Sequence, residues 1–484
     1  MQTITLAMSV DDIIGKVQNA VWGWPLIILI LAAGVWLTVR TGFVQVRHLG
    51  KALKFMVKNE DNGEGEVTSF GALCTALSAT IGTGNIVGVA TAICLGGPGA
   101  LLWMLLAAFF GMATKYSEGF LAIKYREKKD DSHYLGGPFY YIEKGMGSKW
   151  KWLAKLFAVF GICVGLFGIG TFTQINGIAT AVQDFFDPES AHVAFTLLGN
   201  DYTWATVIGG LVVTLCVALV VLGGIQRIAK VSQVIVPFMA ITYVVFALVI
   251  VLGHITAIPA AVKLICQSAF DPQAALGAAT GVTIKLAMQK GIGRGIFSNE
   301  AGLGSAPIAA AAAKTKDTVR QGLVTMTGTF IDTIVICTLT GLSIVVTGAQ
   351  NAFVAGSVEG VKITSRAWQT GLPWNGRFSA FVLMLCLAFF AFTTILGWNY
   401  YSERCLEYLV GSQKFTKVYR YLYILAVFIG PYLTVAAVWN IADICNGLMA
   451  FPNLIALFAV VGKETRAYFA EKRHDLKAMA QDKK

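Results

Sequence analysis

The chain has 484 residues, of which 56% are hydrophobic and only 13% are charged. This composition excludes an ordinary soluble protein, because most of the apolar segments lack the polar face that a soluble helix presents to water. The formal net charge of +11 is spread over many loops, so we relate it to membrane topology and not to nucleic acid. The nine cysteines are scattered through apolar segments without a CxxC pair, and we interpret them as small buried residues.

Apolar segments long enough to cross a bilayer recur along the whole chain, since a span needs roughly 20 such residues. In chain order, the eleven predicted spans are 21–41, 71–93, 100–123, 151–183, 204–222, 231–253, 275–312, 321–347, 377–401, 418–438 and 441–461. The first twenty residues include Asp11, Asp12 and Lys16 and lack a basic start followed by an apolar run. We therefore expect no cleavable signal peptide. The fold class predicted is all-α integral membrane.

Basic residues concentrate in the loops after the first, third, fifth, seventh, ninth and eleventh spans. The loop after the fourth span has no Lys or Arg, and its charged residues are Asp184, Asp187, Glu189 and Asp201. Because basic loops stay on the cytoplasmic side, the N-terminus is expected outside and the C-terminus in the cytoplasm. We expect a multi-pass protein of a prokaryotic plasma membrane, the bacterial inner membrane.

The spans divide into one extra helix followed by two groups of five. Residues 1–70 form the extra helix with a basic cytoplasmic loop, 71–465 a ten-helix core, and 466–484 a charged cytoplasmic tail. The two groups cover 71–253 and 275–461. Since each contains an odd number of spans, the groups have opposite orientations, and any structural repeat between them is inverted.

Glycine-rich interruptions fall in the first span of each group, at Thr80–Asn85 and at Gly291–Gly304. Loose backbone at membrane depth survives where it lines a cavity or a ligand. Broken helices at corresponding positions of two halves indicate a substrate site near the middle of the membrane, as in the LeuT-type fold. The alternative for the second interruption is a re-entrant loop.

The first interruption is suited to a carboxylate. Gly82, Gly84 and Gly88 allow non-helical backbone and close approach of a ligand. Amides freed by unwinding, with the positive end of the restarting helix, would hold an anion, and Thr83 and Asn85 add side-chain donors. The alternative is that these small residues only let helices pack closely.

The ninth span contains Phe390, Thr393 and Thr394, spaced so that both hydroxyls lie near the Phe390 carbonyl. Two hydroxyls and the carbonyls of an unwound helix form a set of neutral oxygens suited to a small hard cation. Alternatively, the two threonines only bond to their own helix backbone.

Polar and charged residues elsewhere in the spans are also candidates, because they are costly in lipid. Gln174 and Asn176 of the fourth span contact the ligand or only join helices, while Phe172, Phe297 and Trp398 shape a small pocket or only pack. Lys290 and Arg294 form a gate or extend to the water interface. The other ionisable residues are Glu118, Lys285, Glu300, Asp332 and Asp443. Any one of the four acids among them would suit a proton relay.

Several stretches are long and specific, namely Thr75–Ala92, Gly96–Gly99 with Gly111–Tyr116, Phe297–Pro307, Phe330–Thr333 and Trp439–Asp443. They resemble the alanine/glycine:cation symporter family, and the resemblance runs from about residue 20 to residue 465. It implies a LeuT-type fold preceded by one extra helix. It also implies sodium-coupled uptake of small neutral amino acids, chiefly alanine and glycine.

Carried over by position, the resemblance places the substrate carboxylate at Thr83, Gly84 and Asn85, with Gln174 reaching the amino acid. Phe297, Ser298 and Asn299 would line the second interruption, and Trp398 would close over the side chain. The implied sodium ligands are the carbonyls of Ser78, Ile81 and Phe390 with the hydroxyls of Thr393 and Thr394. Where the wider fold often carries a cationic gate residue, this chain has Gly88. The resemblance therefore does not assign the residue that forms the extracellular gate, and Arg294 is a candidate for it.

The sequence therefore predicts a sodium-coupled secondary transporter and no enzyme. The alternatives are a proton-coupled amino-acid transporter and an amino-acid sensor on the same fold. A membrane enzyme would need a nucleophile–base pair or a metal cluster, and all five histidines are assigned to loops, ends or the tail. Expected partners are the amino acid, sodium and the lipid bilayer, with no nucleic acid and no obligatory protein partner.

Overall fold

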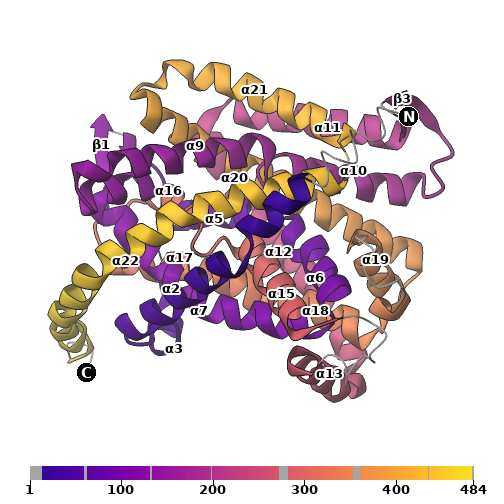
Figure 1. Cartoon of the computed structure of the whole chain (residues 1–484), viewed down its shortest axis with the longest axis horizontal. Helices are drawn as coiled ribbons and strands as arrows, with labels where there is room; N and C mark the ends of the chain where they lie inside the picture. The colour runs from indigo at the N-terminus through magenta and orange to yellow at the C-terminus, as the bar shows by residue number, and fades with distance from the viewer. Residues whose placement is uncertain are drawn as a thin grey trace.

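Long apolar helices make up most of the chain in the computed structural model (Figure 1). The structure describes residues 13–58, 63–130, 133–197, 199–271, 282–352, 360–433 and 435–481, without the side chains of 435–437 and 462–481. Within these ranges eight helices are long and apolar enough to cross a bilayer, and one bent pair makes a ninth. The chain is thus a multi-pass membrane protein, and the count of eleven spans remains a prediction.

The first half of the chain begins with the N-terminal helix, Ile13–Arg40, whose regular second part is α2 (Trp24–Arg40). The bent pair follows, and then a long helix and a short antiparallel hairpin. The other elements of this half are α3 (Val44–Arg47), α4 (Leu49–Val57), α5 (Ser69–Thr80), the π-helical η1 (Gly84–Gly88), α6 (Val89–Gly96), α7 (Gly99–Tyr125), β1 (Glu127–Asp130), β2 (His133–Leu135), α8 (Pro138–Tyr140), η2 (Tyr141–Gly145), η3 (Ser148–Trp150), α9 (Lys151–Phe167), α10 (Phe172–Phe186), β3 (Val193–Leu197), β4 (Asn200–Thr203), α11 (Trp204–Val221), α12 (Gly224–Gly253), η4 (Ile255–Ala257) and α13 (Ile258–Phe270).

The second half contains another interrupted helix and ends in one long helix. Its elements are α15 (Ile284–Asn299), α16 (Ala306–Ala310), α17 (Thr318–Thr329), the π-helical η6 (Phe330–Cys337), α18 (Thr338–Val346), η7 (Ala349–Ala352), α19 (Gly360–Gly371), α20 (Gly376–Val410), η8 (Gln413–Phe415), α21 (Thr416–Ile429), η9 (Gly430–Tyr432) and α22 (Val435–Gln481). The predicted boundary after residue 465 falls within α22, and the division into three parts stays a prediction.

The interrupted helix α5–η1–α6 lies in the middle of the molecule. It packs against α12, α15 and α20, and the N-terminal helix runs beside α22 across the front in Figure 1. The apolar core is continuous through these elements, with Trp368, Trp398 and Tyr243 among its largest fully buried side chains. The centre of this core is therefore where the interruptions must find polar partners.

The first interruption lies where the sequence predicts it. α5 ends at Thr80, the helix resumes at Gly84, and the two parts are bent by 50°. A further break that the sequence analysis did not predict separates α9 from α10, so the predicted span 151–183 is interrupted between Phe167 and Phe172.

The second interruption lies later than predicted. Residues 291–299 are helical within α15, and regular helix is absent only over 300–305 before α16 begins. The prediction that the break starts at Gly291 was wrong for a physical reason. A Cβ at Gly291 would lie 2.2 Å from the Ala100 carbonyl oxygen, so this glycine allows close approach to α7 instead of unwinding the helix. The start of the predicted span 275–312 lies outside the described residues.

Candidate functional site

The backbone of the first interruption is held by two amide side chains. Asn85 Oδ1 accepts a hydrogen bond from the Gly82 amide at 2.9 Å, and Gln174 Oε1 accepts one from the Thr83 amide at 3.0 Å. Gln174 also donates to the Ile169 carbonyl at 3.0 Å, which lies in the unpredicted break before α10. Gln174 thus satisfies backbone groups of both the first interruption and the break between α9 and α10. Such partners are needed because a bilayer offers no water to these groups.

The first interruption is pressed between α20 and α15. A Cβ at Gly82 would lie 2.5 Å from Thr394 Oγ1 of α20, and a Cβ at Gly84 would lie 3.1 Å from the Ser298 Cα of α15. The Phe297 ring is equally close to Gly84, at 3.3 Å from that Cβ position. These two glycines therefore allow three distant segments of the chain to meet at one point.

Neutral oxygens gather on the α20 side of this point. Thr394 Oγ1 lies 3.2 Å from the Ile81 carbonyl oxygen and 3.0 Å from that of Phe390, while Thr393 Oγ1 lies 3.0 Å from the latter. Ile81 caps α5 in an extended conformation, so its carbonyl is not committed to the helix. Both hydroxyls are bonded to backbone carbonyls, which fits either a cation site or the simple packing alternative.

Ser78 lies in the last turn of α5 and is fully buried. Its hydroxyl donates to the Thr75 carbonyl at 2.8 Å, whereas the predicted sodium ligand is its own carbonyl. The following residue, Ala79, touches α20 closely, because a Cβ at Gly397 would lie 2.7 Å from its amide nitrogen. The predicted sodium ligands therefore come from two segments in direct contact, the end of α5 and the middle of α20.

Asp332 of η6 joins both interrupted helices, a role that the sequence analysis did not assign. The Asn85 side chain donates to Asp332 Oδ1 at 2.6 Å, and Ser298 Oγ donates to Oδ2 at 3.0 Å. Thr333 Oγ1 also donates to Oδ2, at 2.6 Å. The only signal in the sequence was a carboxyl group in an apolar segment, which must find donors when it is buried. Asn85 and Ser298 are thus directed at Asp332.

The second interruption is fixed by polar contacts from α20 and α22. Trp398 Nε1 donates to Glu300 Oε1 at 2.7 Å, and Asn453 donates to the Gly302 carbonyl at 2.9 Å. Asn453 also donates to Glu118 of α7 at 2.7 Å. Glu300 has a φ of 56°, a left-handed conformation that costs a non-glycine residue roughly 1–3 kcal/mol. Such strain persists only because its surroundings hold it.

The other predicted site residues differ in how closely they approach the first interruption. Thr83 Oγ1 is buried without a hydrogen-bond partner among the described residues, so it is available to a ligand. Asn299 donates to Thr333 Oγ1 at 3.0 Å and accepts from the Ala301 amide at 2.9 Å, which fixes the end of α15. Phe172 packs with Ala426 and Val438 in a small separate cluster. Its place in the substrate pocket stays a prediction.

A model described as the sodium:alanine symporter family matches residues 7–483. The chain belongs to this family. The sodium/alanine symporter AgcS of Methanococcus maripaludis is 44% identical over 97% of this chain and 100% of its own length. The putative sodium/proton-dependent alanine carrier YrbD of Bacillus subtilis is 38% identical, over 92% of this chain and 89% of its own. A crystal structure of MhsT with L-phenylalanine matches 83% of this chain and 99% of its own with a TM-score of 0.52 and 11% identity.

Membership of this family makes the chain an amino-acid symporter and not an enzyme. The likeness to MhsT concerns the fold alone, and it places the interrupted helices in a LeuT-type architecture. The two interrupted helices of the symporter therefore meet at Gly84 and Ser298, close to the segments 81–83 and 300–305 that separate their helical parts.

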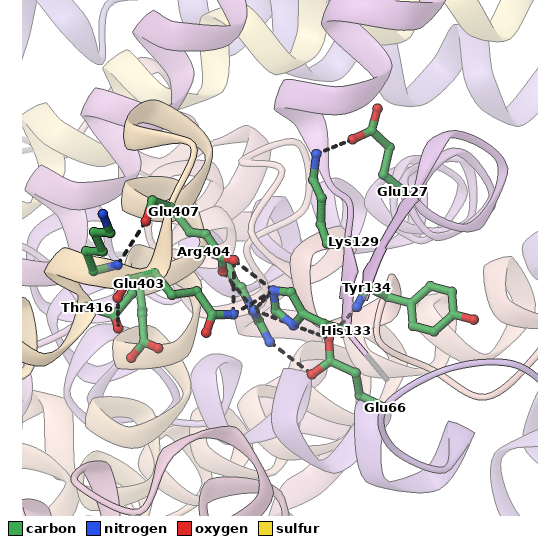
Figure 2. Close-up of polar contacts among 12 residues, drawn as sticks. Glu66, Glu127, Lys129, His133, Tyr134, Glu403, Arg404, Glu407 and Thr416 are labelled. Atoms are coloured by element: carbon green, nitrogen blue, oxygen red, sulfur yellow. Dashed lines mark hydrogen bonds and ion pairs between the residues drawn. The ribbon is translucent and has the colours of Figure 1, made fainter. Parts of the chain in front are cut away.

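A buried ionic network, which we call the Arg404 cluster, joins the segment that precedes α5, the β1–β2 hairpin and the last part of α20. It consists of Glu66, His133, Arg404 and Glu407 (Figure 2). Arg404 pairs with Glu66 at 3.0 Å and with Glu407 at 2.9 Å. His133 of the β1–β2 hairpin contacts Glu407 at 2.8 Å and Glu66 at 3.2 Å. The cluster thus fastens the chain entering α5 to α20 and to the hairpin.

Protonation of His133 completes the charge balance of the Arg404 cluster. Burial opposes that protonation, but hydrogen bonds with Glu407 and Glu66 outweigh it and raise the pKa of His133 from 6.5 to about 9. Hydrogen bonding to His133 and the charge of Arg404 likewise outweigh burial and lower the pKa of Glu66. Since the folded pKa of His133 exceeds the unfolded value, its stabilising contribution is complete below about pH 6.5 and is lost as the pH rises through about 9.

We expect the thermal stability of the purified symporter to fall as the pH is raised through about 9, and His133→Gln to flatten this fall. Melting temperatures of both proteins from neutral to alkaline pH measure the effect. His254→Gln is the control, because the ring of this histidine lies outside the Arg404 cluster, with its Nδ1 2.9 Å from the Ile250 carbonyl oxygen. Equal slopes in wild type and His133→Gln would contradict the assignment.

Proposed function

We propose that this symporter couples the uptake of a small neutral amino acid, alanine or glycine, to sodium by alternating access. The observation that carries the proposal is the meeting of both interrupted helices beside the oxygen cluster. Gly84 touches Ser298, and the Ile81 carbonyl three residues earlier lies 3.2 Å from Thr394 Oγ1. An amino acid at the first site and a cation at the second would share one stretch of backbone, so each would favour binding of the other.

The residues fit sodium by their chemistry. The proposed ligands are the carbonyls of Ser78, Ile81 and Phe390 and the hydroxyls of Thr393 and Thr394, all of them neutral oxygens in a fully buried position. Neutral hard oxygens suit a small hard cation. The name of the relative AgcS, a sodium/alanine symporter, supports the same ion and the same substrate.

The substrate site we propose lies at Thr83, Gly84 and Asn85, completed by Gln174, Phe297, Ser298, Asn299 and Trp398, with Phe172 at its margin. Its clearest free donor is the Thr83 hydroxyl, which has no hydrogen-bond partner in the part of the chain that the structure describes. Since Asn85 and Ser298 are bonded to Asp332, they would act on the ligand only after these bonds rearrange. We place the protein in a prokaryotic plasma membrane with the N-terminus outside, because the basic loops then lie in the cytoplasm.

A proton-coupled transporter is the second candidate, and Asp332 is the observation that favours it. This carboxyl is fully buried between the two interrupted helices and is bonded to both. A protonatable group at such a place would suit a proton path. The name of the relative YrbD includes both sodium and proton. The sodium dependence of the threonine variants separates the two candidates.

Replacing both Thr393 and Thr394 with valine should raise the sodium concentration for half-maximal alanine uptake at least tenfold. A polar contact to a charged group is worth about 1.5–3 kcal/mol, and about 1.4 kcal/mol corresponds to a factor of ten. Uptake into proteoliposomes at varied sodium measures this. Ser402→Ala is the matched control, since this α20 hydroxyl also bonds its own helix, at 2.7 Å from the Trp398 carbonyl. Unchanged sodium dependence in the double variant would favour Asp332 and a proton.

Thr83→Val should weaken alanine binding about tenfold or more, because it removes a buried donor that a carboxylate would use. Thr80→Val is the control, since the Thr80 hydroxyl is already bonded to the Ala76 carbonyl at 2.6 Å. Alanine methyl ester, which lacks the carboxylate, should fail to compete with labelled alanine even in large excess. Effective competition by the ester would mean that this interruption does not hold the carboxylate.

Trp398→Ala should weaken alanine binding and admit bulkier neutral amino acids, if the indole closes the pocket. Contacts of methyl size discriminate by about 1–3 kcal/mol, or roughly 10–200-fold. Trp398→Phe is the comparison variant, because it removes the indole N–H that donates to Glu300 at 2.7 Å but keeps a large ring. Competition of leucine with alanine measures both. An unchanged preference for alanine in Trp398→Ala would make Trp398 a packing residue.

A further inference from the structure

A second ionic group, the Arg294 cluster, lies on the far side of the interruptions from the Arg404 cluster. Arg294 of α15 pairs with Asp443 of α22 at 3.0 Å, and both side chains are largely buried. The Arg294 guanidinium lies 4.6 Å from the Trp439 ring centroid and 5.5 Å from that of Phe297. Ion pairs at membrane depth are costly and are usually kept for function.

The Arg294 cluster lies against the restarted half of the first interrupted helix. A Cβ at Gly88 would be 3.9 Å from Arg294 Cδ, so the arginine side chain covers the restarted half of the helix where residue 88 has no side chain. Beneath it, the Phe297 ring lies 5.0 Å from Trp439 and in van der Waals distance of Gly84. Gly84, Phe297 and the Arg294–Asp443 pair thus form successive layers from the interruption outward.

The opposite placement of the two clusters follows from the chain path. The chain passes from Glu66 of the Arg404 cluster through α5 to the interruption, and α6 continues away from it. A Cβ at Gly96, the end of α6, would lie 3.2 Å from Lys290, one turn before Arg294. The Arg294 cluster therefore lies along α6 and the Arg404 cluster at the start of α5.

The N-terminal helix is hydrogen-bonded to both helices that carry this ion pair. Trp22 Nε1 donates to the Asp443 carbonyl at 2.7 Å, and Gln18 donates to Asp443 Oδ2 at 3.2 Å. On the other side, Gln289 of α15 donates to the Trp22 carbonyl at 3.3 Å. The two oxygens of Asp443 are thus divided between Arg294 and Gln18, which fixes the direction of the carboxylate.

The fit of the N-terminal helix against α22 is close. A Cβ at Gly447 would lie 2.4 Å from Val21 Cγ1 and 3.2 Å from Trp22 Nε1. The cleft that remains beside Arg294 and Lys290 is about 20 Å³, which is close to the minimum that holds one water. Among the described residues, the N-terminal helix therefore narrows the approach to Arg294 and Lys290 to about the size of one water, while a separate cavity of about 240 Å³ lies further along the same helix, beside Asn19 and Lys285.

We propose that the Arg294–Asp443 pair is the gate at the end where the N-terminal helix begins, and that Gln18 and Trp22 are positioning residues that hold Asp443 in the closed state. This inference rests on the proposed transport function. It assigns the cation of the gate to the second interrupted helix instead of the first. It also gives the extra helix a defined task, which is to set how often this end opens.

The test uses the full chain in proteoliposomes, with the native cysteines replaced and a reporter cysteine introduced as Gly88→Cys beneath Arg294. A membrane-impermeant methanethiosulfonate reagent is added on one side, without amino acid and without sodium. Trp22→Phe and Gln18→Ala should each speed modification about fivefold, the shift in open population expected from losing one hydrogen bond. Asp443→Asn should speed it more, because the ion pair itself is lost.

Trp24→Phe is the matched control, since Trp24 lies on the same helix but is 39% exposed. The paired change Arg294→Asp with Asp443→Arg should slow modification relative to Asp443→Asn, because it restores an ion pair while the Gln18 contact with residue 443 stays lost. An unchanged rate in Trp22→Phe, an equal increase in Trp24→Phe, or faster modification only from the Arg404 side would overturn the proposal. Alanine uptake is measured separately, so a symporter that fails to carry alanine yet shows the expected rates would refute the substrate and retain the gate.

Discussion

The contact of Asn85 and Ser298 with Asp332 is the interaction on which the centre of the molecule depends. It joins the first interrupted helix, the second one and η6 through one carboxylate. Unwound backbone at this depth has no water to bond with, so the protein must supply a hydrogen-bond partner for every freed group. The Asn85 side chain makes two such links, because its nitrogen donates to Asp332 and its oxygen accepts from the Gly82 amide at 2.9 Å.

The second interruption is held by a different kind of contact. Glu300, at a φ of 56°, is fixed by Trp398 and Ser305, and Asn453 holds the Gly302 carbonyl. Ser305 belongs to the second interruption itself, whereas Trp398 comes from α20 and Asn453 from α22, neither of which carries the first interruption. Movement of α20 would therefore alter contacts at both interruptions, because Trp398 bonds to Glu300 of the second and Thr394 bonds to the Ile81 carbonyl of the first. That arrangement suits a symporter in which binding at one place must alter the other.

The sequence predicted those features that depend on neighbouring residues. The Gly-Thr-Gly-Asn run placed the first interruption correctly, and the spacing of Thr393 and Thr394 placed both hydroxyls near the Phe390 carbonyl. It did not reveal which glycines unwind a helix and which admit a neighbour. Gly291 belongs to the second kind only because Ala100 lies against it. It also could not pair Asn85 with Asp332, since 247 residues separate them and no local pattern records that distance.

Both ionic clusters are formed in this structure, so both ends of the proposed pathway are fastened at once. Each cluster takes one partner from an interrupted helix or the chain leading into it, Glu66 before α5 and Arg294 in α15. A ligand can shift such an equilibrium only by its difference in affinity between the states. Because Asn85 and Ser298 are already bonded to Asp332, a ligand that uses these donors would compete with the central contact. The strength of that contact would then set both the affinity for substrate and the cost of moving the two interrupted helices apart.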